Sequence, residues 1–465
     1  PAPPPAPEPP APEPPAPEPT APEPTVPEPT ADATAAKLAT LEERLQKVED
    51  ELAAAKDDNT FLEEKLAALL PVIGKLGGYL DVGFFATTGN GAGTRSDYAS
   101  TYFPEYAGIV PGSWVFMGDP FSTAVNSRGE PADLGESRAI VFDPIDSQGK
   151  STFLVNAVNL TLFGGIGKTG STNISVDFVP RGRDVSAPGG LFLGDYLDVK
   201  LAYGEWKPEL ESFELSLQGG KFDSVLGFEY RSMESPDRLG ITPSLACRYT
   251  CGRPIGIKAR GRFLDTRLIA NVAVTNGSHF TESFAFAGEL DTNDMKTVAG
   301  RLSYVIEDKV EVGASGALGA QDVQPANDVY QWHVGADLHV DYKDVELTAE
   351  YVQGKARGDT TQAGAMSGAH CDLAPCIRYK SAYGLVGYRL TNMFVPYLRV
   401  DWRDALHRSG ASFVYVSQLL RGTAGVRAEI GERVIWKLEG TTNRELGRIP
   451  RFPNDVLTTS LVIKY

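Results

Sequence analysis

The chain has 465 residues, of which 42% are apolar and 48 are glycine, and its formal charge is −16. That length allows one large domain with further segments attached. No run of 18 uncharged apolar residues occurs, which excludes a membrane-spanning helix. The sequence begins at Pro1 and lacks a basic stretch followed by an apolar one, so we expect an exported protein whose targeting peptide has been removed.

Residues 1–33 form a segment rich in proline and glutamate. Within it, residues 1–30 repeat Ala-Pro-Glu-Pro and hold 16 of the 33 prolines. Such a composition cannot build a core and predicts an extended polyproline II spacer. Two interpretations stay open: a periplasmic arm that touches peptidoglycan or another periplasmic partner, and a disordered tail without a partner.

Residues 34–72 carry an unbroken heptad, which predicts a periplasmic coiled coil that ends at Pro71. Asn59 in the seam would fix the register of the helices. A coiled coil requires partner helices, so the segment predicts a homo-oligomer, and the analogy with general porins favours a trimer. The seam consists of Leu38, Leu41, Leu45, Val48, Leu52, Ala55, Asn59, Leu62, Leu66 and Leu69.

Residues 78–465 alternate apolar and polar side chains and end on an aromatic residue, Tyr465. This pattern predicts an all-β transmembrane barrel of about sixteen antiparallel strands in the bacterial outer membrane. The expected strands are 78–87, 152–163, 172–179, 194–206, 210–222, 255–264, 267–276, 296–305, 309–319, 329–341, 344–354, 378–390, 393–403, 413–430, 433–443 and 456–465.

Short turns recur at every second junction between these strands and predict the periplasmic rim. The turns are Lys207-Pro208-Glu209, Leu264-Asp265-Thr266, Glu307-Asp308-Lys309, Tyr342-Lys343-Asp344, Thr391-Asn392 and Gly431-Glu432. Longer loops lie between them, and 88–151 and 223–254 are the longest. Because the coiled coil and Tyr465 both belong to the turn side, the number of strands must be even.

The alternation also separates the two faces of the wall. Leu398, Val400 and Trp402 should face lipid, while Arg399 and Asp401 should face inward. A soluble sandwich could alternate in the same way, but its interior would have to be filled with apolar side chains. Charged inward rows therefore predict a water-filled lumen.

Cations in the lumen bear on which solutes could pass. Residues 1–77 account for a charge of −9, which leaves −7 on the barrel, so net charge alone does not indicate an anion channel. Rows of guanidinium and ammonium groups nevertheless attract anions. The alternative is that these cations pair with inward Glu214, Asp401, Glu429 and Glu439 as in a general pore. The candidate pore residues are Lys258, Arg260, Arg262, Arg231, Arg238, Arg248, Arg253, Arg301, Arg399, Arg403, Arg421, Arg427 and Lys437.

Four cysteines form two close pairs, Cys247 with Cys251 and Cys371 with Cys376. In an exported protein this spacing predicts two local disulfides. A zinc site is the alternative, although His370 is the only nearby imidazole.

Residues 220–305 contain several distinctive short motifs, which are Gly220-Lys221-Phe222-Asp223, Gly227-Phe228-Glu229-Tyr230, Ser235-Pro236-Asp237, Val274-Thr275-Asn276-Gly277, Asp291 to Lys296 and a strand with Arg301. On these motifs the segment resembles the phosphate-selective and polyphosphate-selective porins. The resemblance implies a trimeric sixteen-stranded channel with a basic pathway for anions. In sixteen-stranded porins the third loop, here 223–254, commonly folds inward and narrows the pore.

The expected function is passive diffusion of small hydrophilic solutes, with no cofactor. No nucleophile motif surrounds any of the five histidines, which argues against an enzyme. An acidic appendage argues against nucleic-acid binding. A trimeric autotransporter also joins a coiled coil to a barrel, but each of its chains supplies only a few strands. The remaining rival is a structural tether that links the barrel to the cell wall.

Overall fold

The computed structural model describes residues 44, 46–47, 75–88, 94–96, 115–118, 123–130, 145, 147, 149–178, 197–277, 293–320, 330–356, 376–409 and 413–465. The chain divides into two compact units, Pro1–Leu69 and Leu70–Tyr465. In the first unit, Arg44, Gln46 and Lys47 are helical. The proline-rich arm and all the predicted seam residues lie outside the described residues. Within the described ranges, no helix has the length and apolar character needed to cross a membrane.

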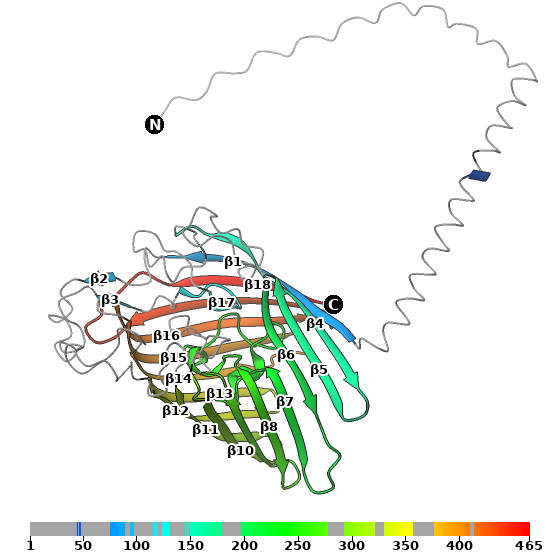
Figure 1. The fold of residues 1–465 in the computed structure, drawn as a ribbon. Coiled ribbons are helices and arrows are strands. Elements are labelled where there is room, and N and C mark those ends of the chain that lie inside the picture. Colours follow the sequence, from blue (N-terminus) through cyan, green and yellow to red (C-terminus); the bar gives the residue numbers. More distant parts are fainter. Residues whose placement is uncertain are drawn as a thin grey trace, which may run out of the picture. The chain divides into compact units, whose positions relative to one another are not determined.

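Sixteen long strands of the second unit close into an antiparallel barrel (Figure 1). Strand β1 pairs with β4 on one side and with β18 on the other, which completes the ring. The predicted count of sixteen is confirmed. The strands are β1 (Lys75–Thr87), β4 (Thr152–Ile166), β5 (Gly170–Phe178), β6 (Leu197–Trp206), β7 (Glu214–Lys221), β8 (Ile255–Phe263), β9 (Leu268–Thr275), β10 (Thr297–Ile306), β11 (Val310–Ala320), β12 (Tyr330–Tyr342), β13 (Val345–Ala356), β14 (Cys376–Tyr388), β15 (Phe394–Ser409), β16 (Phe413–Ile430), β17 (Val434–Glu445) and β18 (Val456–Lys464).

Two further strands, β2 (Thr94–Ser96) and β3 (Val115–Met117), belong to the first loop, 88–151. They pair with each other, and β3 also runs parallel to the start of β16. The sequence did not predict either strand, because three residues carry too little alternation to be recognised.

Several of the short turns adopt left-handed backbone conformations. Glu307 and Asp308, between β10 and β11, have φ of 52° and 55°, and Lys343, between β12 and β13, has φ of 57°. Positive φ at the centre of a hairpin gives a turn whose twist matches that of the flanking strands. Short connections alternate with longer ones around the barrel, as predicted, but the predicted turn Lys207-Pro208-Glu209 is too short, because β6 ends at Trp206 and β7 begins only at Glu214.

The strands present the two faces that the alternation predicted. On β15, Leu398 and Val400 are 59% and 56% exposed on the outside of the barrel, whereas Arg399 and Asp401 are buried on the inside. On β12, Val334 is exposed and His333 is buried in the same manner.

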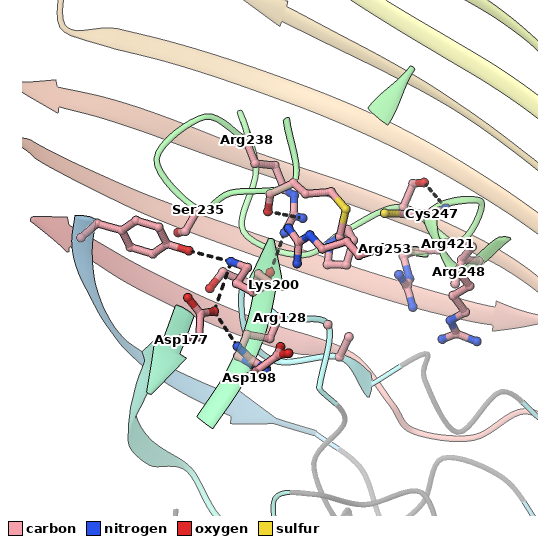
Figure 2. Close-up of a pocket in the computed structure, with 18 residues that line it drawn as sticks. Arg128, Asp177, Asp198, Lys200, Ser235, Arg238, Cys247, Arg248, Arg253 and Arg421 are labelled. Atoms are coloured by element: carbon pink, nitrogen blue, oxygen red, sulfur yellow. Dashed lines mark hydrogen bonds and ion pairs between the residues drawn. The ribbon is translucent and has the colours of Figure 1, made fainter. Parts of the chain in front are cut away.

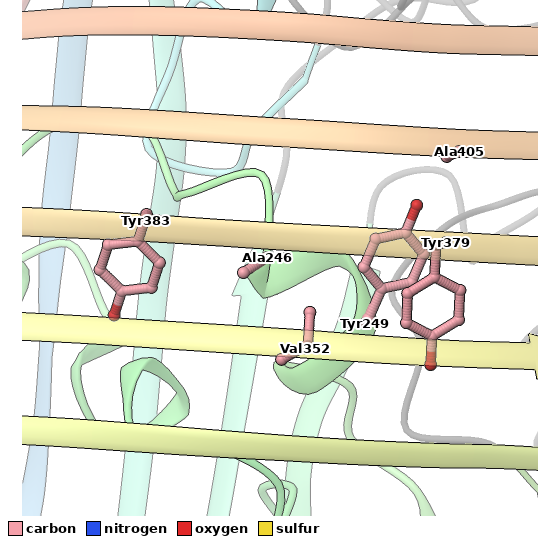
Figure 3. Packing of buried hydrophobic residues seen from close by; sticks show 6 residues of the cluster. All are labelled: Ala246, Tyr249, Val352, Tyr379, Tyr383 and Ala405. Carbon is pink, nitrogen blue, oxygen red and sulfur yellow. The ribbon is translucent and has the colours of Figure 1, made fainter.

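The interior of the barrel is partly filled by residues of the third loop. The third loop carries a short 3-10 helix, η5 (Glu229–Ser232), and a short α-helix, α3 (Cys247–Thr250). Figure 3 shows Tyr249 of α3 beside Tyr379 of β14, and their ring centroids are 3.7 Å apart. The hydrophobic cluster around this pair also includes Ala246, Val352, Tyr383 and Ala405.

Candidate functional site: a lumen narrowed by two loops

The third loop is anchored to the inner wall by β17. Lys437 donates hydrogen bonds from Nζ to three carbonyl oxygens of the loop, those of Ser235, Arg238 and Gly240, at 2.6, 2.6 and 2.9 Å. Glu439 accepts a hydrogen bond from the backbone N–H of Ile241 at 2.8 Å. The predicted inward fold of this loop is thus confirmed by direct contacts.

Strands β13 and β15 hold the same loop at other points. Glu350 on β13 accepts from the backbone N–H groups of Phe228 and Glu229 at 2.7 and 2.5 Å. Arg399 on β15 donates to the carbonyl oxygen of Thr242 at 2.7 Å and to Asp401 at 2.9 Å. Buried charges are stabilised when such hydrogen bonds satisfy them, so these contacts fix the loop tightly.

A segment of the first loop, residues 123–130, also lies inside the barrel. Its Ser127 hydroxyl donates to Asp81 on β1 at 2.5 Å, and Ser235 of the third loop donates to the same carboxylate at 2.7 Å. Asn156 and Ser460 complete the set of donors at 2.9 and 2.6 Å. Asp81 therefore connects both loops to the wall, a role that the sequence did not reveal.

A chain of alternating charges crosses from the first loop to the third. Asp177 on β5 pairs with Arg128 of the first loop at 2.6 Å and with Lys200 on β6 at 3.1 Å. Lys200 also contacts Glu234 of the third loop at 2.5 Å, and Glu234 pairs with Arg253 at 2.7 Å. Burial alone would raise the pKa of Glu234, but the charges of Lys200 and Arg253 outweigh it and hold the pKa at about 2.

Most of the predicted pore cations have partners in the structure. Arg301 contacts Glu311 at 2.7 Å, Arg427 contacts Glu429 at 2.9 Å, and Arg262 contacts Glu214 at 3.2 Å. The pairing considered as the alternative to anion selectivity therefore occurs at Glu214, Asp401 and Glu429. Glu439 instead binds the third loop.

Two further cations that the sequence predicted to line the pore contact side chains inside the barrel. Arg421 donates from Nε to Asn443 at 3.1 Å, and the guanidinium of Arg403 lies 5.3 Å from the centroid of the Tyr249 ring. Arg248 belongs to α3, and it lines a cavity together with Arg421. That these three residues set selectivity stays a prediction.

Strand β8 brings Lys258, Arg260 and Arg262 together, as predicted, on one side of a cavity of about 690 Å³. Arg231 and Tyr230 of the third loop also line this cavity. Lys258 donates to the carbonyl oxygen of Asp223 at 3.2 Å. Arg260 makes no hydrogen bond or ion pair with any residue that the structure describes, and its Nε is buried without an acceptor. We call Lys258, Arg260 and Arg262 the basic row.

The cysteine pair of the third loop forms a disulfide between Cys247 and Cys251. Because both sulfur atoms are bonded to each other, the zinc alternative is wrong for this pair. Cys371 lies outside the described residues, so the second disulfide stays a prediction.

Residues 152–460 match the family described as β-barrel porin-2, OmpL-like. The chain belongs to this family. Membership places it among porin-like channels of the bacterial outer membrane and confirms the porin character expected from the sequence. No curated protein matches the chain.

Several solved structures share the architecture at low identity. The outer-membrane channel DcaP of Acinetobacter baumannii has 10% identity and a TM-score of 0.49, over 84% of this chain and 96% of its own. OmpF of Salmonella typhi has 10% identity and a TM-score of 0.48, over 84% and 97%. The anion-selective porin from Comamonas acidovorans has 9% identity and a TM-score of 0.44, over 84% and 98%.

Proposed function

We propose that the protein is a passive diffusion channel for small hydrophilic solutes and that it favours anions. The basic row carries this proposal. It lines the cavity of about 690 Å³ together with Tyr230 and Arg231 of the third loop, and its Arg260 forms no ion pair with a carboxylate that the structure describes.

The local charge balance favours anions along this wall. Lys258 donates to the carbonyl oxygen of Asp223 and forms no ion pair with a carboxylate that the structure describes. The pair between Arg262 and Glu214 is solvent-exposed, with side chains 39% and 63% accessible, and such pairs contribute little. Glu205, which also lines the cavity, pairs with Lys207 at 2.9 Å.

The test replaces all three residues of the basic row with glutamine and measures the reversal potential of single channels in a potassium chloride gradient. A unit charge about 6 Å from an ion in water contributes roughly 0.7 kcal/mol, a factor of about 3 in local ion concentration. We therefore expect the chloride-to-potassium permeability ratio to fall at least about threefold.

A matched control changes the same net charge elsewhere. Arg267, Lys309 and Lys343 lie exposed in the short turns, and their triple replacement by glutamine should leave the permeability ratio nearly unchanged. Equal ratios in the wild type and the basic-row variant would show that the basic row does not set the preference, and a wild-type ratio of 1 or less would refute the anion preference itself. A folded barrel without any conductance would instead support the tether interpretation.

We also propose that the protein assembles through residues 34–72 into a homo-oligomer, with a trimer as the expected form. The heptad supports this proposal, together with the separation of Pro1–Leu69 as a unit distinct from the barrel.

A further inference from the structure

The charged groups of two lumen cavities are satisfied to different degrees. A cavity of about 230 Å³ lies between the first loop and the third loop, and Figure 2 shows its Arg128 and Lys200 held by Asp177, with Asp198 also contacting Arg128. The cavity of about 690 Å³ beside the basic row differs, because polar groups of its wall lack partners among the described residues. We call this second space the β8 cavity.

The formal charges around the β8 cavity are largely paired. Four ion pairs join carboxylates to cations in or beside its lining, and only Lys258 and Arg260 of the basic row form no ion pair with a described carboxylate. A ligand therefore does not need a charge in order to fit this lining. The pairs are Glu205 with Lys207, Glu214 with Arg262, Asp223 with Arg253 and Glu311 with Arg231, at 2.9, 3.2, 3.0 and 2.8 Å.

Three polar groups of this wall nevertheless lack hydrogen-bond partners among the described residues. Gln218 donates from Nε2 to Glu205 at 3.0 Å, which fixes the orientation of its amide, and its buried Oε1 has no donor. Asn271 is 4% exposed, and its buried Nδ2 has no acceptor. The buried Nε of Arg260 has no acceptor either. The wall thus offers an open acceptor beside open donors.

The register of β7, β8 and β9 brings these groups onto one inward face. Ser216 lies opposite Arg260, and Arg260 lies opposite Asn271. Gln218 lies two residues along β7 from Ser216. Side chains directly opposite each other on antiparallel strands have Cβ atoms about 4.5 to 5.5 Å apart. One small ligand can therefore span the open groups.

The mixture of donors and acceptors selects the chemistry of that ligand. An ionised carboxylate only accepts hydrogen bonds and could not satisfy Oε1 of Gln218. A hydroxyl group both donates and accepts, so a ligand with several hydroxyls can serve Gln218, Asn271 and Arg260 together. Such bonds would remove the cost of leaving these buried groups unsatisfied.

Aromatic rings form another part of the lining. Tyr203 of β6, Phe213 between β6 and β7, and Tyr230 of the third loop all line the β8 cavity. The ring of Phe213 stacks on Phe263 with centroids 5.2 Å apart, and the Tyr203 hydroxyl accepts from Asn173 at 3.3 Å, which holds both rings in place. A cyclic sugar presents an apolar C–H face to such rings and hydroxyls at its rim, which is the usual division of contacts in a small-molecule pocket.

We propose that the β8 cavity binds a neutral cyclic sugar, with its hydroxyls on Gln218 and Asn271 and its C–H face against Tyr230. The volume of about 690 Å³ lies within the range of about 300 to 1,000 Å³ that is usual for small-molecule sites. This inference deepens and rests on the proposed channel function, because such a sugar is one of the small hydrophilic solutes and reaches the cavity through the lumen.

The test titrates glucose into the full-length protein, in a detergent without a sugar headgroup, and measures the heat of binding. Sorbitol, the open-chain alcohol of glucose, and glucuronate, its acid, are the comparison ligands. We expect saturable glucose binding and at least about tenfold weaker sorbitol binding, since sorbitol lacks a rigid apolar face. Glucuronate should bind at most about threefold more tightly than glucose, the factor expected from one unit charge of the basic row.

Two variants locate the site. Asn271→Ala should raise the dissociation constant of glucose about fivefold, since it removes one hydrogen bond to the ligand, and it should not lower stability, since the Nδ2 atom has no partner to lose. Tyr230→Leu keeps an apolar side chain but removes the ring, and it should weaken glucose to a similar extent. Asn392→Ala, exposed in the turn before β15, is the matched control and should not change the affinity.

Three results would each overturn the proposal: no saturable glucose binding, equal affinities for glucose and sorbitol, or an affinity that neither variant of the cavity lowers. A preference for glucuronate beyond about threefold would overturn the neutral class of ligand. The heat of binding does not depend on conduction, so this test is separate from the reversal potentials. Glucose binding by a channel without anion preference would leave the sugar site standing, and an anion-selective channel that binds no glucose would give the reverse.

Discussion

Arg231 in the third loop and Glu311 on β11 form a two-pronged ion pair, with Nη1 to Oε2 at 2.8 Å and Nη2 to Oε1 at 3.0 Å. Glu311 also accepts from Arg301 at 2.7 Å. This carboxylate neutralises a cation that lines the same cavity as the basic row. Glu311 therefore holds η5 to the wall, and on the proposed function it would also limit the positive charge that a passing ion meets.

Glu311→Gln should increase the anion preference. The substitution keeps the size of the side chain but leaves Arg231 and Arg301 without the negative charge of Glu311, so the chloride-to-potassium permeability ratio should rise about threefold. Reversal potentials in a salt gradient measure it. Glu307→Gln, in an exposed turn, is the control and should have no effect. A ratio that falls in the Glu311 variant would contradict the assignment of this cavity to the ion path.

Asp81→Asn should loosen both inserted loops. Both oxygens of the Asp81 carboxylate accept hydrogen bonds, from four side chains in all. An asparagine has only one acceptor oxygen, so its NH₂ group would face side chains that are themselves hydrogen-bond donors. We expect a loss of about 2 kcal/mol in stability, with a lower temperature of heat-modifiable unfolding and noisier single-channel currents. Asp265→Asn, in an exposed turn, should change neither quantity. Unchanged noise in the Asp81 variant would show that the loops do not depend on this carboxylate.

Glu234→Gln should destabilise the protein in a pH-dependent way. The folded pKa of Glu234, about 2, lies below its ordinary value of 4.5, so its contribution to stability is complete above about pH 4.5 and is lost as the pH falls through 2. The depression corresponds to at most about 3 kcal/mol.

Denaturant unfolding of the wild type and the Glu234 variant at several pH values would measure this contribution. The difference in unfolding free energy should be largest near neutral pH and should shrink toward zero near pH 2. A difference that stays constant from pH 7 to 2 would mean that packing, and not charge, holds Glu234.

Removal of residues 1–70 should leave a conducting barrel. The chain divides between Leu69 and Leu70, and both loops that narrow the lumen are bonded within the second unit. Single-channel conductance should match that of the full chain, while size measurements in detergent should show weaker self-association. Absence of conductance in a closed barrel would mean that the N-terminal segment contributes to the channel.

The strands were predictable because a barrel wall imposes a period of two on the sequence, and the turns because tight hairpins need specific residues. β16 began and ended where the alternation placed it, at Phe413 and Ile430. The insertion of residues 123–130 was not predictable. Its contacts to Asp81 and Asp177 join positions far apart in the sequence, and no periodic pattern encodes them.

The inward direction of the cations was predictable, but their surroundings were not. Alternation placed Lys437 on the inside of β17, yet it could not show that three carbonyl oxygens of the third loop surround the ammonium group. Lys200 was missed altogether, because a register shift in the pairing of β5 and β6 interrupts the alternation beside it.

The third loop is bonded mainly to β1, β11, β13, β15 and β17, whereas the basic row belongs to β8. The strands that hold the loop are thus mostly distinct from the strand that carries the basic row. On the proposed function, substitutions of Arg260 and Arg262 would change the ionic preference without removing a hydrogen bond to the loop, whereas Lys258 also binds the Asp223 carbonyl oxygen. Related chains could therefore diverge in the solutes they admit without having to evolve a new way of folding the loop.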